Sequence, residues 1–250
     1  MRTILLALLL TSAAGAQAQL LDAEELAAAP VYYNLASAVK NPSKVYRLHL
    51  SGLKPQDVQK KLSVLSAMTQ LQELKINRCG LTEIPPAVFE LRNLQELNLE
   101  YNILTFLPGD VGKLYNLKKL SAAYNLIDSL PAEIGSLKKL RTLNLGYNFI
   151  RFLPREIGNL AELRTVALND NELLSLPPTV GQWDNIETLV INGNNLRQLP
   201  SEFGNLKHLR FLHIGNNYLT GEAAYMLLSR LPHTHKIIDH VPYPTTLYNN

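Results

Sequence analysis

A repeat of 23 residues constrains this chain more than any other feature of its sequence. Seven segments of that length follow one another without a gap until the last one breaks down. They start at Leu71, Leu94, Leu117, Leu140, Leu163, Ile186 and Leu209. Self-similarity at a fixed period is typical of solenoids, in which each coil buries its apolar side against its neighbours. The 250-residue chain is therefore expected to build one elongated array with a continuous core.

Each repeat follows one pattern, which Leu140–Glu162 shows as L-x-x-L-x-L-x-x-N-x-L-x-x-L-P-x-x-I-G-x-L-x-x. We number the positions of a repeat from its first residue, so that Leu140 holds position one. The first six positions alternate between apolar and polar residues, which predicts a short strand with one side in the core. Successive strands should stack as a parallel sheet. The Leu-Pro step interrupts regular helix, so the opposite side should be irregular with short helical turns.

Position nine is asparagine in six repeats. These residues are Asn102, Asn125, Asn148, Asn171, Asn194 and Asn217. An asparagine side chain both donates and accepts hydrogen bonds, so it can satisfy buried backbone groups where the chain leaves the sheet. Cys79 holds this position in the first repeat, where its thiol can serve as a weak donor. It is the only cysteine, so no internal disulfide can form and stability must come from packing.

These residues resemble the leucine-rich-repeat superfamily, in particular its 23-residue Leu-Pro-x-x-Ile-Gly class. That class includes Ras-scaffold-type repeats, plant Ras-group-related repeats and many bacterial proteins. The resemblance covers Val45–Leu219. It implies an α/β solenoid, a curved horseshoe whose parallel concave sheet binds proteins, with a mostly irregular or short-helical convex side and helical caps. The signalling role of the cytoplasmic members is not implied, because this chain is expected to be exported.

Residues 1–18 are predicted to be a signal peptide. Arg2 supplies a positive start, Ile4–Leu10 an apolar segment, and Ala16–Ala18 a small-x-small motif that predicts cleavage before Gln19. The apolar segment is much shorter than the ~20 residues that span a bilayer. An N-terminal membrane anchor or a buried helix is the alternative. The mature protein is expected to be periplasmic or extracellular, without stable membrane insertion.

The remaining chain divides into three parts. Residues 19–70 are predicted to form an N-terminal cap with a degenerate first repeat, and residues 71–219 seven repeats, the last of them partial. Residues 220–250 are expected to form a C-terminal cap that includes an edge strand near Thr234–His240. Terminal coils of a solenoid differ from the middle ones because one of their sides faces solvent. Trp183 replaces a leucine of the repeat and is expected in the core.

The sequence offers little sign of catalysis. Glu73 and Glu96 share position three on adjacent strands, so their Cβ atoms should lie about 5 Å apart. A retaining glycosidase uses carboxylates at such a separation. However, Lys75 and Lys119 are neighbours and the sheet is open, so we interpret the group as a solvated charge cluster. The protein is not expected to be an enzyme.

Metal and nucleic-acid binding are not expected either. His233, His235, Asp239 and His240 have suitable side chains, but their spacing matches no structural zinc pattern. There is no glycine-rich phosphate loop, and we predict no cofactor. The 24 basic and 21 acidic residues are dispersed, whereas nucleic-acid binding needs a concentrated basic surface.

The concave face is the predicted binding surface, and another protein is the predicted partner. Tyrosines at position eight are bordered by apolar residues at position ten, as in interface hot spots. The predicted partner-binding residues are Tyr101, Tyr124, Tyr147 and Phe149, with Glu73, Glu96, Glu100 and Lys119 at one end and Phe211 and His213 at the other. The alternative for the tyrosines is a family consensus without a binding role. The alternative for the function is a surface adhesin or a carbohydrate binder.

Overall fold

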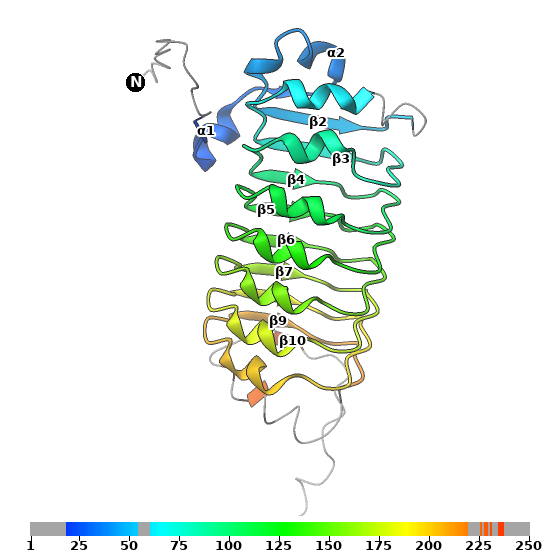
Figure 1. Cartoon of the computed structure of the whole chain (residues 1–250). Coiled ribbons are helices and arrows are strands. Elements are labelled where there is room, and N and C mark those ends of the chain that lie inside the picture. The colour runs from blue at the N-terminus through cyan, green and yellow to red at the C-terminus, as the bar shows by residue number, and fades with distance from the viewer. Residues whose placement is uncertain are drawn as a thin grey trace, which may run out of the picture.

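A computed structural model describes residues 19–54, 61–219, 226, 228, 229, 231 and 235–237. The predicted signal peptide and most of the predicted C-terminal cap lie outside the described residues, as do the side chains of the four candidate metal ligands. The described chain winds as a solenoid, with strands on one side and short 3-10 helices on the other (Figure 1). The predicted leucine-rich-repeat architecture is confirmed.

One parallel sheet runs the length of the solenoid, with its strands in sequence order. Its strands are β1 (Val31–Tyr32), β2 (Arg47–Ser51), β3 (Glu73–Asn77), β4 (Glu96–Asn98), β5 (Lys119–Ser121), β6 (Thr142–Asn144), β7 (Thr165–Ala167), β8 (Thr188–Val190), β9 (Phe211–His213) and β10 (His235–Ile237). From β3 to β9 each residue pairs with the one 23 positions later, as Glu96 does with Lys119. β2 and β3 pair at an offset of 26, as Arg47 does with Glu73. The edge strand predicted near Thr234–His240 is confirmed as β10, whereas β1 was not predicted.

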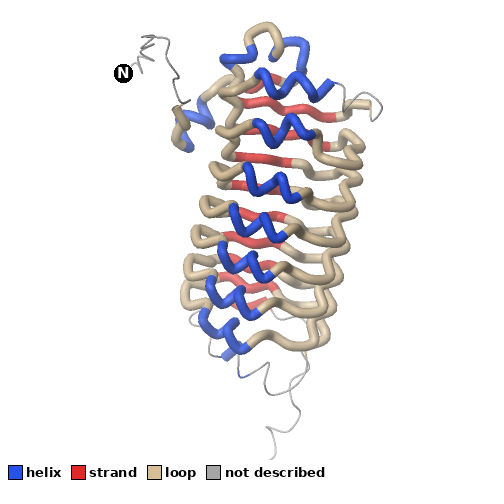
Figure 2. Tube along the Cα trace, in the orientation of Figure 1, coloured by secondary structure: helices blue, strands red, loops and turns tan. Residues whose placement is uncertain are grey.

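The opposite side carries one 3-10 helix in each of the first six repeats (Figure 2). These helices are η3 (Pro86–Glu90), η4 (Gly109–Lys113), η5 (Ala132–Ser136), η6 (Arg155–Asn159), η7 (Pro178–Gln182) and η8 (Ser201–Asn205). Each follows the proline of its Leu-Pro step directly, because proline has a φ suited to the turn and no N–H to satisfy. The short helical turns predicted for the convex side are thus confirmed. The N-terminal region adds α1 (Ala23–Ala28), α2 (Leu35–Ala38), η1 (Pro42–Lys44) and η2 (Ser63–Ala67).

The core is a column of aliphatic side chains between the sheet and the 3-10 helices. In the central repeat, Leu140, Leu143 and Leu145 are at most 1% exposed. Trp183 is also buried, and its indole Nε1 donates to the Ile157 carbonyl oxygen at 2.9 Å. Its predicted place in the core is confirmed. No helix in the described part of the chain has the length and hydrophobicity to cross a membrane.

The asparagines of position nine connect successive coils. Asn148 Oδ1 accepts from the Ile127 backbone N–H at 2.9 Å, and its Nδ2 donates to the carbonyl oxygens of Ala122 and Leu145 at 3.0 Å each. Only 5% of Asn148 is exposed, so these bonds satisfy groups that water does not reach. Cys79 Sγ fills the same place with a weaker contact, 3.3 Å from the Asn77 carbonyl oxygen. The predicted role of this position is confirmed.

Candidate protein-binding surfaces

A buried carboxylate lies at the N-terminal end of the concave sheet. Glu73 on β3 is 4% exposed. Its oxygens lie 2.6 Å from Arg47 Nε, 2.5 Å from His49 Nε2 and 2.9 Å from Lys75 Nζ. Burial alone raises the pKa of a carboxyl, but the hydrogen bonds from Arg47, Lys75 and His49 outweigh it and lower the pKa of Glu73 to about 2. The prediction of a solvated cluster is therefore wrong for Glu73, which has no surface to offer a partner.

The contacts of Glu73 stabilise the N-terminal end of the fold. Arg47 also donates through Nη1 to the carbonyl oxygens of Ala27 and Ala29, at 2.7 and 3.3 Å, and so holds the end of α1 against the sheet. Burial lowers the pKa of His49 more than its bond to Glu73 raises it, which favours the neutral imidazole. A carboxylate this firmly ionised cannot act as a general acid. The pairing of Glu73 with Glu96 in register is confirmed.

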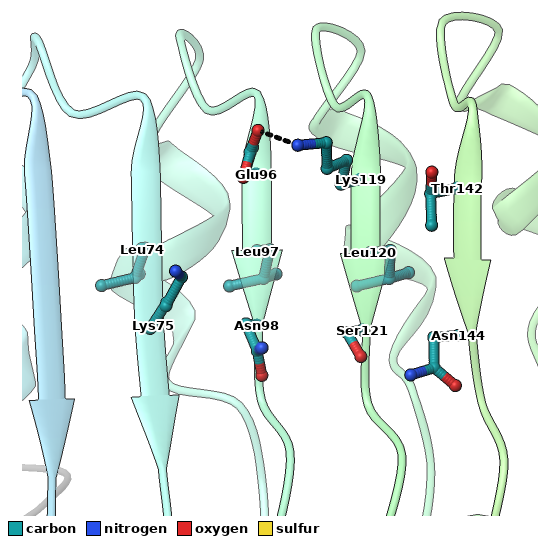
Figure 3. A pocket seen from close by; sticks show the side chains of 10 residues that line it. All are labelled: Leu74, Lys75, Glu96, Leu97, Asn98, Lys119, Leu120, Ser121, Thr142 and Asn144. Carbon is teal, nitrogen blue, oxygen red and sulfur yellow. Dashed lines mark ion pairs between the residues drawn. The ribbon is translucent and has the colours of Figure 1, made fainter. Parts of the chain in front are cut away.

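Next to this cluster, a shallow depression of about 240 Å³ crosses β3 to β6 (Figure 3). It is lined by Leu74, Lys75, Glu96, Leu97, Asn98, Lys119, Leu120, Ser121, Thr142 and Asn144. At one side Lys119 Nζ pairs with Glu96 Oε1 at 2.6 Å, and the Lys119 side chain is 58% exposed. At the other side Asn98, Ser121 and Asn144 form a row, because they pair in register on β4, β5 and β6.

Glu100 borders the same depression. It follows β4 by two residues, and its Oε1 accepts from Ser121 Oγ at 2.5 Å and from Asn144 Nδ2 at 3.3 Å. The structure thus brings together three predicted binding residues, Glu96, Glu100 and Lys119. Their carboxylates and ammonium group stand among hydroxyl and amide groups from neighbouring strands.

Phe211 and His213 lie on β9, at the other end of the concave face. Phe211 is 43% exposed, and the guanidinium carbon of Arg210 lies 5.9 Å from its ring centroid. Three threonines in register separate Phe211 from Lys119. At about 4.8 Å per strand, these two residues are roughly 19 Å apart. Phe211 and His213 are therefore not part of the depression.

The three tyrosines form a stacked column. The ring centroids of Tyr101 and Tyr124 are 4.4 Å apart, and those of Tyr124 and Tyr147 are 4.2 Å apart, with planes inclined by 7° and 9°. The guanidinium carbon of Arg78 lies 4.3 Å from the Tyr101 centroid, so it covers the free face of that ring. Each tyrosine remains 40–45% exposed through its edge. Partial desolvation within the column, together with the hydrogen bond to Tyr147, raises the pKa of Tyr124.

This column stands beside the concave strands rather than on them. β4 ends at Asn98, three residues before Tyr101, and the other tyrosines have the same spacing from β5 and β6. All three have φ of 57–58°, in the left-handed region that bulky residues rarely adopt. Their predicted place on the concave face is corrected to the edge of the sheet where the strands end. Asp170, Gly193 and Asn216 share position eight, and their residue types are the sequence signal for this backbone turn.

Exposed apolar residues extend the column into a patch. Ile103, Leu126 and Phe149 at position ten are 45–47% exposed. Position thirteen adds Phe106 and Phe152, which are 48% and 58% exposed. These two residues were not predicted from the sequence, although each precedes a buried leucine. We call the edge patch the set of Tyr101, Ile103, Phe106, Tyr124, Leu126, Tyr147, Phe149 and Phe152.

A parallel solenoid of 23-residue coils with an asparagine column defines a leucine-rich-repeat protein. The chain belongs to that family. The leucine rich repeat family model matches residues 69–127, 115–173 and 161–219, which together make up more than half of the chain. The family consists in general of non-catalytic modules that typically bind proteins. No curated protein matches the chain in sequence.

Several solved structures share the fold. A leucine-rich-repeat protein of Leptospira interrogans is 27% identical with a TM-score of 0.64, over 86% of this chain and 66% of that one, just under two thirds. An internalin from Listeria monocytogenes is 20% identical with a TM-score of 0.71, over 87% of this chain and 70% of the other. The plant peptide hormone receptor RGFR1 in complex with RGF2 is 24% identical with a TM-score of 0.68, over 84% of this chain and 38% of the receptor. The latter two likenesses concern the fold alone.

Proposed function

We propose that this chain is an exported, non-catalytic binding module that holds an extended segment of another protein across the concave depression between β3 and β6. The observation that carries the proposal is the lining of the depression. Three successive strands, β4 to β6, present an ammonium–carboxylate pair on one side and a row of amide and hydroxyl groups on the other.

Such a lining suits a polypeptide in extended conformation. An extended chain presents a carbonyl oxygen and an N–H at regular intervals, and it needs partners of both kinds. Asn98 and Asn144 can donate and accept, and Ser121 can accept while its own hydroxyl donates to Glu100. Lys119 and Glu96 can bind charged side chains of either sign. Since Glu100 accepts hydrogen bonds from Ser121 and Asn144, these two side chains are held in place before a ligand binds.

The carbohydrate alternative receives less support from the same geometry. A sugar ring packs well against the uncovered face of an aromatic side chain. In the tyrosine column the faces of Tyr124 are covered by its two neighbours, and Arg78 covers the outer face of Tyr101. The residues that line the depression include no aromatic side chain. A protein segment is therefore the better candidate for the depression.

Export is supported by the sequence of residues 1–18 and is compatible with the contacts of the cap. Gln72 Oε1 accepts from the Leu21 backbone N–H at 2.9 Å, and Gln72 Nε2 donates to the Gln19 carbonyl oxygen at 3.1 Å. Gln95 Nε2 donates to the Leu21 carbonyl oxygen at 2.9 Å. A mature chain that begins at Gln19 would retain all three bonds.

The test is a selection against two ligand classes in parallel. The purified mature chain would be offered a phage-displayed library of linear peptides and, separately, a glycan array. We expect enrichment of peptides that share a sequence pattern. These peptides should bind the Lys119→Glu variant more weakly than the wild-type chain. Lys138→Glu, on an exposed lysine that bonds to the Asn159 carbonyl oxygen on the far side, is the matched control. Glycan binding without peptide enrichment would overturn the proposal.

A further inference from the structure

We propose that the edge patch is a self-association surface, which binds the edge patch of a second copy of this chain around a two-fold axis through Tyr124. The proposal concerns a different surface from the concave depression. The depression is built by residues of β3 to β6, whereas the edge patch lies on the loops that follow strands.

The first argument is the symmetry of charge along position eight. Read along the solenoid, this position holds Arg78, Tyr101, Tyr124, Tyr147 and Asp170. Both charged residues share the left-handed backbone of the tyrosines, with φ of 54° and 52°, so they continue the same column. The column thus has a cation at one end, an anion at the other and Tyr124 at its centre.

In a two-fold symmetric dimer, the cation of each column can pair with the anion of the other. In a dimer of that symmetry, a contact between two different residues occurs in two copies. If the axis passes through Tyr124 and the columns run antiparallel, Arg78 lies opposite Asp170 of the second copy, and Tyr101 opposite Tyr147. A parallel arrangement would place like charges opposite one another, which costs free energy. The charges therefore select the antiparallel orientation.

The apolar flanks have the same symmetry. Position ten holds Ile103, Leu126 and Phe149, so Leu126 is at the centre with a large apolar residue on each side. At position thirteen, Phe106 and Phe152 stand on either side of Ser129, and Phe106 and Ser129 form a parallel bridge that fixes their spacing. The same two-fold rotation therefore places Ile103 opposite Phe149 of the second copy, and Phe106 opposite its Phe152, so that apolar residues meet in both rows.

The patch is also large enough for a dimer. Its eight side chains are 40–58% exposed. With roughly 150–250 Å² for a large apolar or aromatic side chain, the patch presents roughly 700 Å². That area approaches the ~800 Å² per partner of a stable interface and exceeds the usual largest apolar patch of a monomer, about 300–600 Å². Because the rings already stack in the single chain, their association immobilises few additional rotamers.

The first experiment measures the mass of the mature chain at micromolar concentrations by sedimentation equilibrium. We expect a monomer–dimer equilibrium. Leu126→Arg brings two guanidinium groups together at the axis and should weaken dimerisation at least tenfold, while Lys138→Arg should leave it unchanged. Circular dichroism of each variant verifies that it is folded. A wild-type chain that stays monomeric would overturn the proposal.

A charge exchange then tests the orientation. Arg78→Asp and Asp170→Arg should each weaken the dimer, because each places like charges opposite one another twice. Both single variants mixed together, or the double variant alone, should regain dimerisation, since opposite charges then face one another at both contacts. Arg is tolerated in the left-handed backbone at position 78, so Asp170→Arg should fold. A dimer indifferent to these changes, or one that the double variant fails to restore, would contradict the antiparallel arrangement. Peptide binding to the depression should be unaffected throughout, so the two proposals fail separately.

Discussion

The phenol rings of Tyr124 and Tyr147 stack with centroids 4.2 Å apart and planes inclined by 9°. This contact has two consequences, because both rings are also 40% or more exposed. Part of each ring contributes to the stability of the single chain, and the remaining edge is available to another molecule. A substitution in the column therefore needs two measurements, one of unfolding and one of association.

We expect Tyr124→Ala to lower the free energy of unfolding by about 1–3 kcal/mol, since two stacked pairs worth about 0.5–1.5 kcal/mol each are lost. Tyr124→Gly should be more stable than Tyr124→Ala by about 1 kcal/mol, because glycine adopts φ near 57° without the cost that a Cβ imposes. Urea unfolding of both variants, in the Leu126→Arg background to suppress association, gives the comparison. An alanine variant as stable as the glycine variant would show that the left-handed backbone is not strained there.

Asn148→Ala should lower the free energy of unfolding by about 1–3 kcal/mol, since buried backbone groups of two coils, at Ala122 and Ile127 in one and at Leu145 in the next, lose their partner. Cys79→Ala, in the first full repeat, should cost less, because a thiol makes only a weak hydrogen bond. Urea unfolding midpoints measure both effects. Equal losses at the two positions would refute the account of position nine.

The carboxylate of Glu73 predicts an acid-sensitive cap. Its pKa is lowered in the folded chain from an ordinary 4.5 to about 2. The unfolded chain therefore takes up the proton first, so the contribution of Glu73 is complete above pH 4.5 and is lost as the pH falls towards 2. Glu73→Gln should flatten this part of the stability profile and also destabilise the chain at neutral pH, where Arg47 and Lys75 lose their counter-ion. Thermal unfolding between these pH values, with Glu156→Gln as control, tests the assignment. A profile unchanged by Glu73→Gln would contradict it.

Export has a direct chemical test. Native protein purified from the producing cell should begin near Gln19, because the motif at Ala16–Ala18 directs cleavage before that residue. Mass spectrometry of the intact chain gives the N-terminus. Recovery from the cytosol of protein that begins with Met1 would refute the proposal of export.

The repeating parts of the fold could be predicted from the sequence because they depend on periodic residues. The leucines, the Leu-Pro step and Asn148 occupy fixed positions, and each position has one physical task. The position of Trp183 in the core could be predicted for the same reason, since it replaces a leucine of the repeat. The boundaries of β1 could not be predicted, since two residues carry no period and their pairing depends on β2.

The candidate site was less predictable for two reasons. Glu73 is buried by Arg47 and His49 of β2, whose offset of 26 residues departs from the repeat, so their approach was not visible in the 23-residue alignment. The 23-residue pattern does not show that the backbone turns after each strand, so the tyrosines were expected on the concave face. Position eight instead has a left-handed backbone, which turns Tyr101 and its neighbours to the edge of the sheet.

Binding at the depression is the central claim, and the affinity of one selected peptide for the wild-type chain and two variants tests it most directly. Isothermal titration would compare the wild-type chain with Lys119→Glu, which places a second carboxylate beside Glu96, and with Leu126→Arg in the edge patch. We predict that Lys119→Glu weakens binding at least tenfold, about 1.4 kcal/mol, and that Leu126→Arg leaves it unchanged. Unchanged affinity in Lys119→Glu, with a loss in Leu126→Arg, would contradict the account and place the binding site at the edge patch.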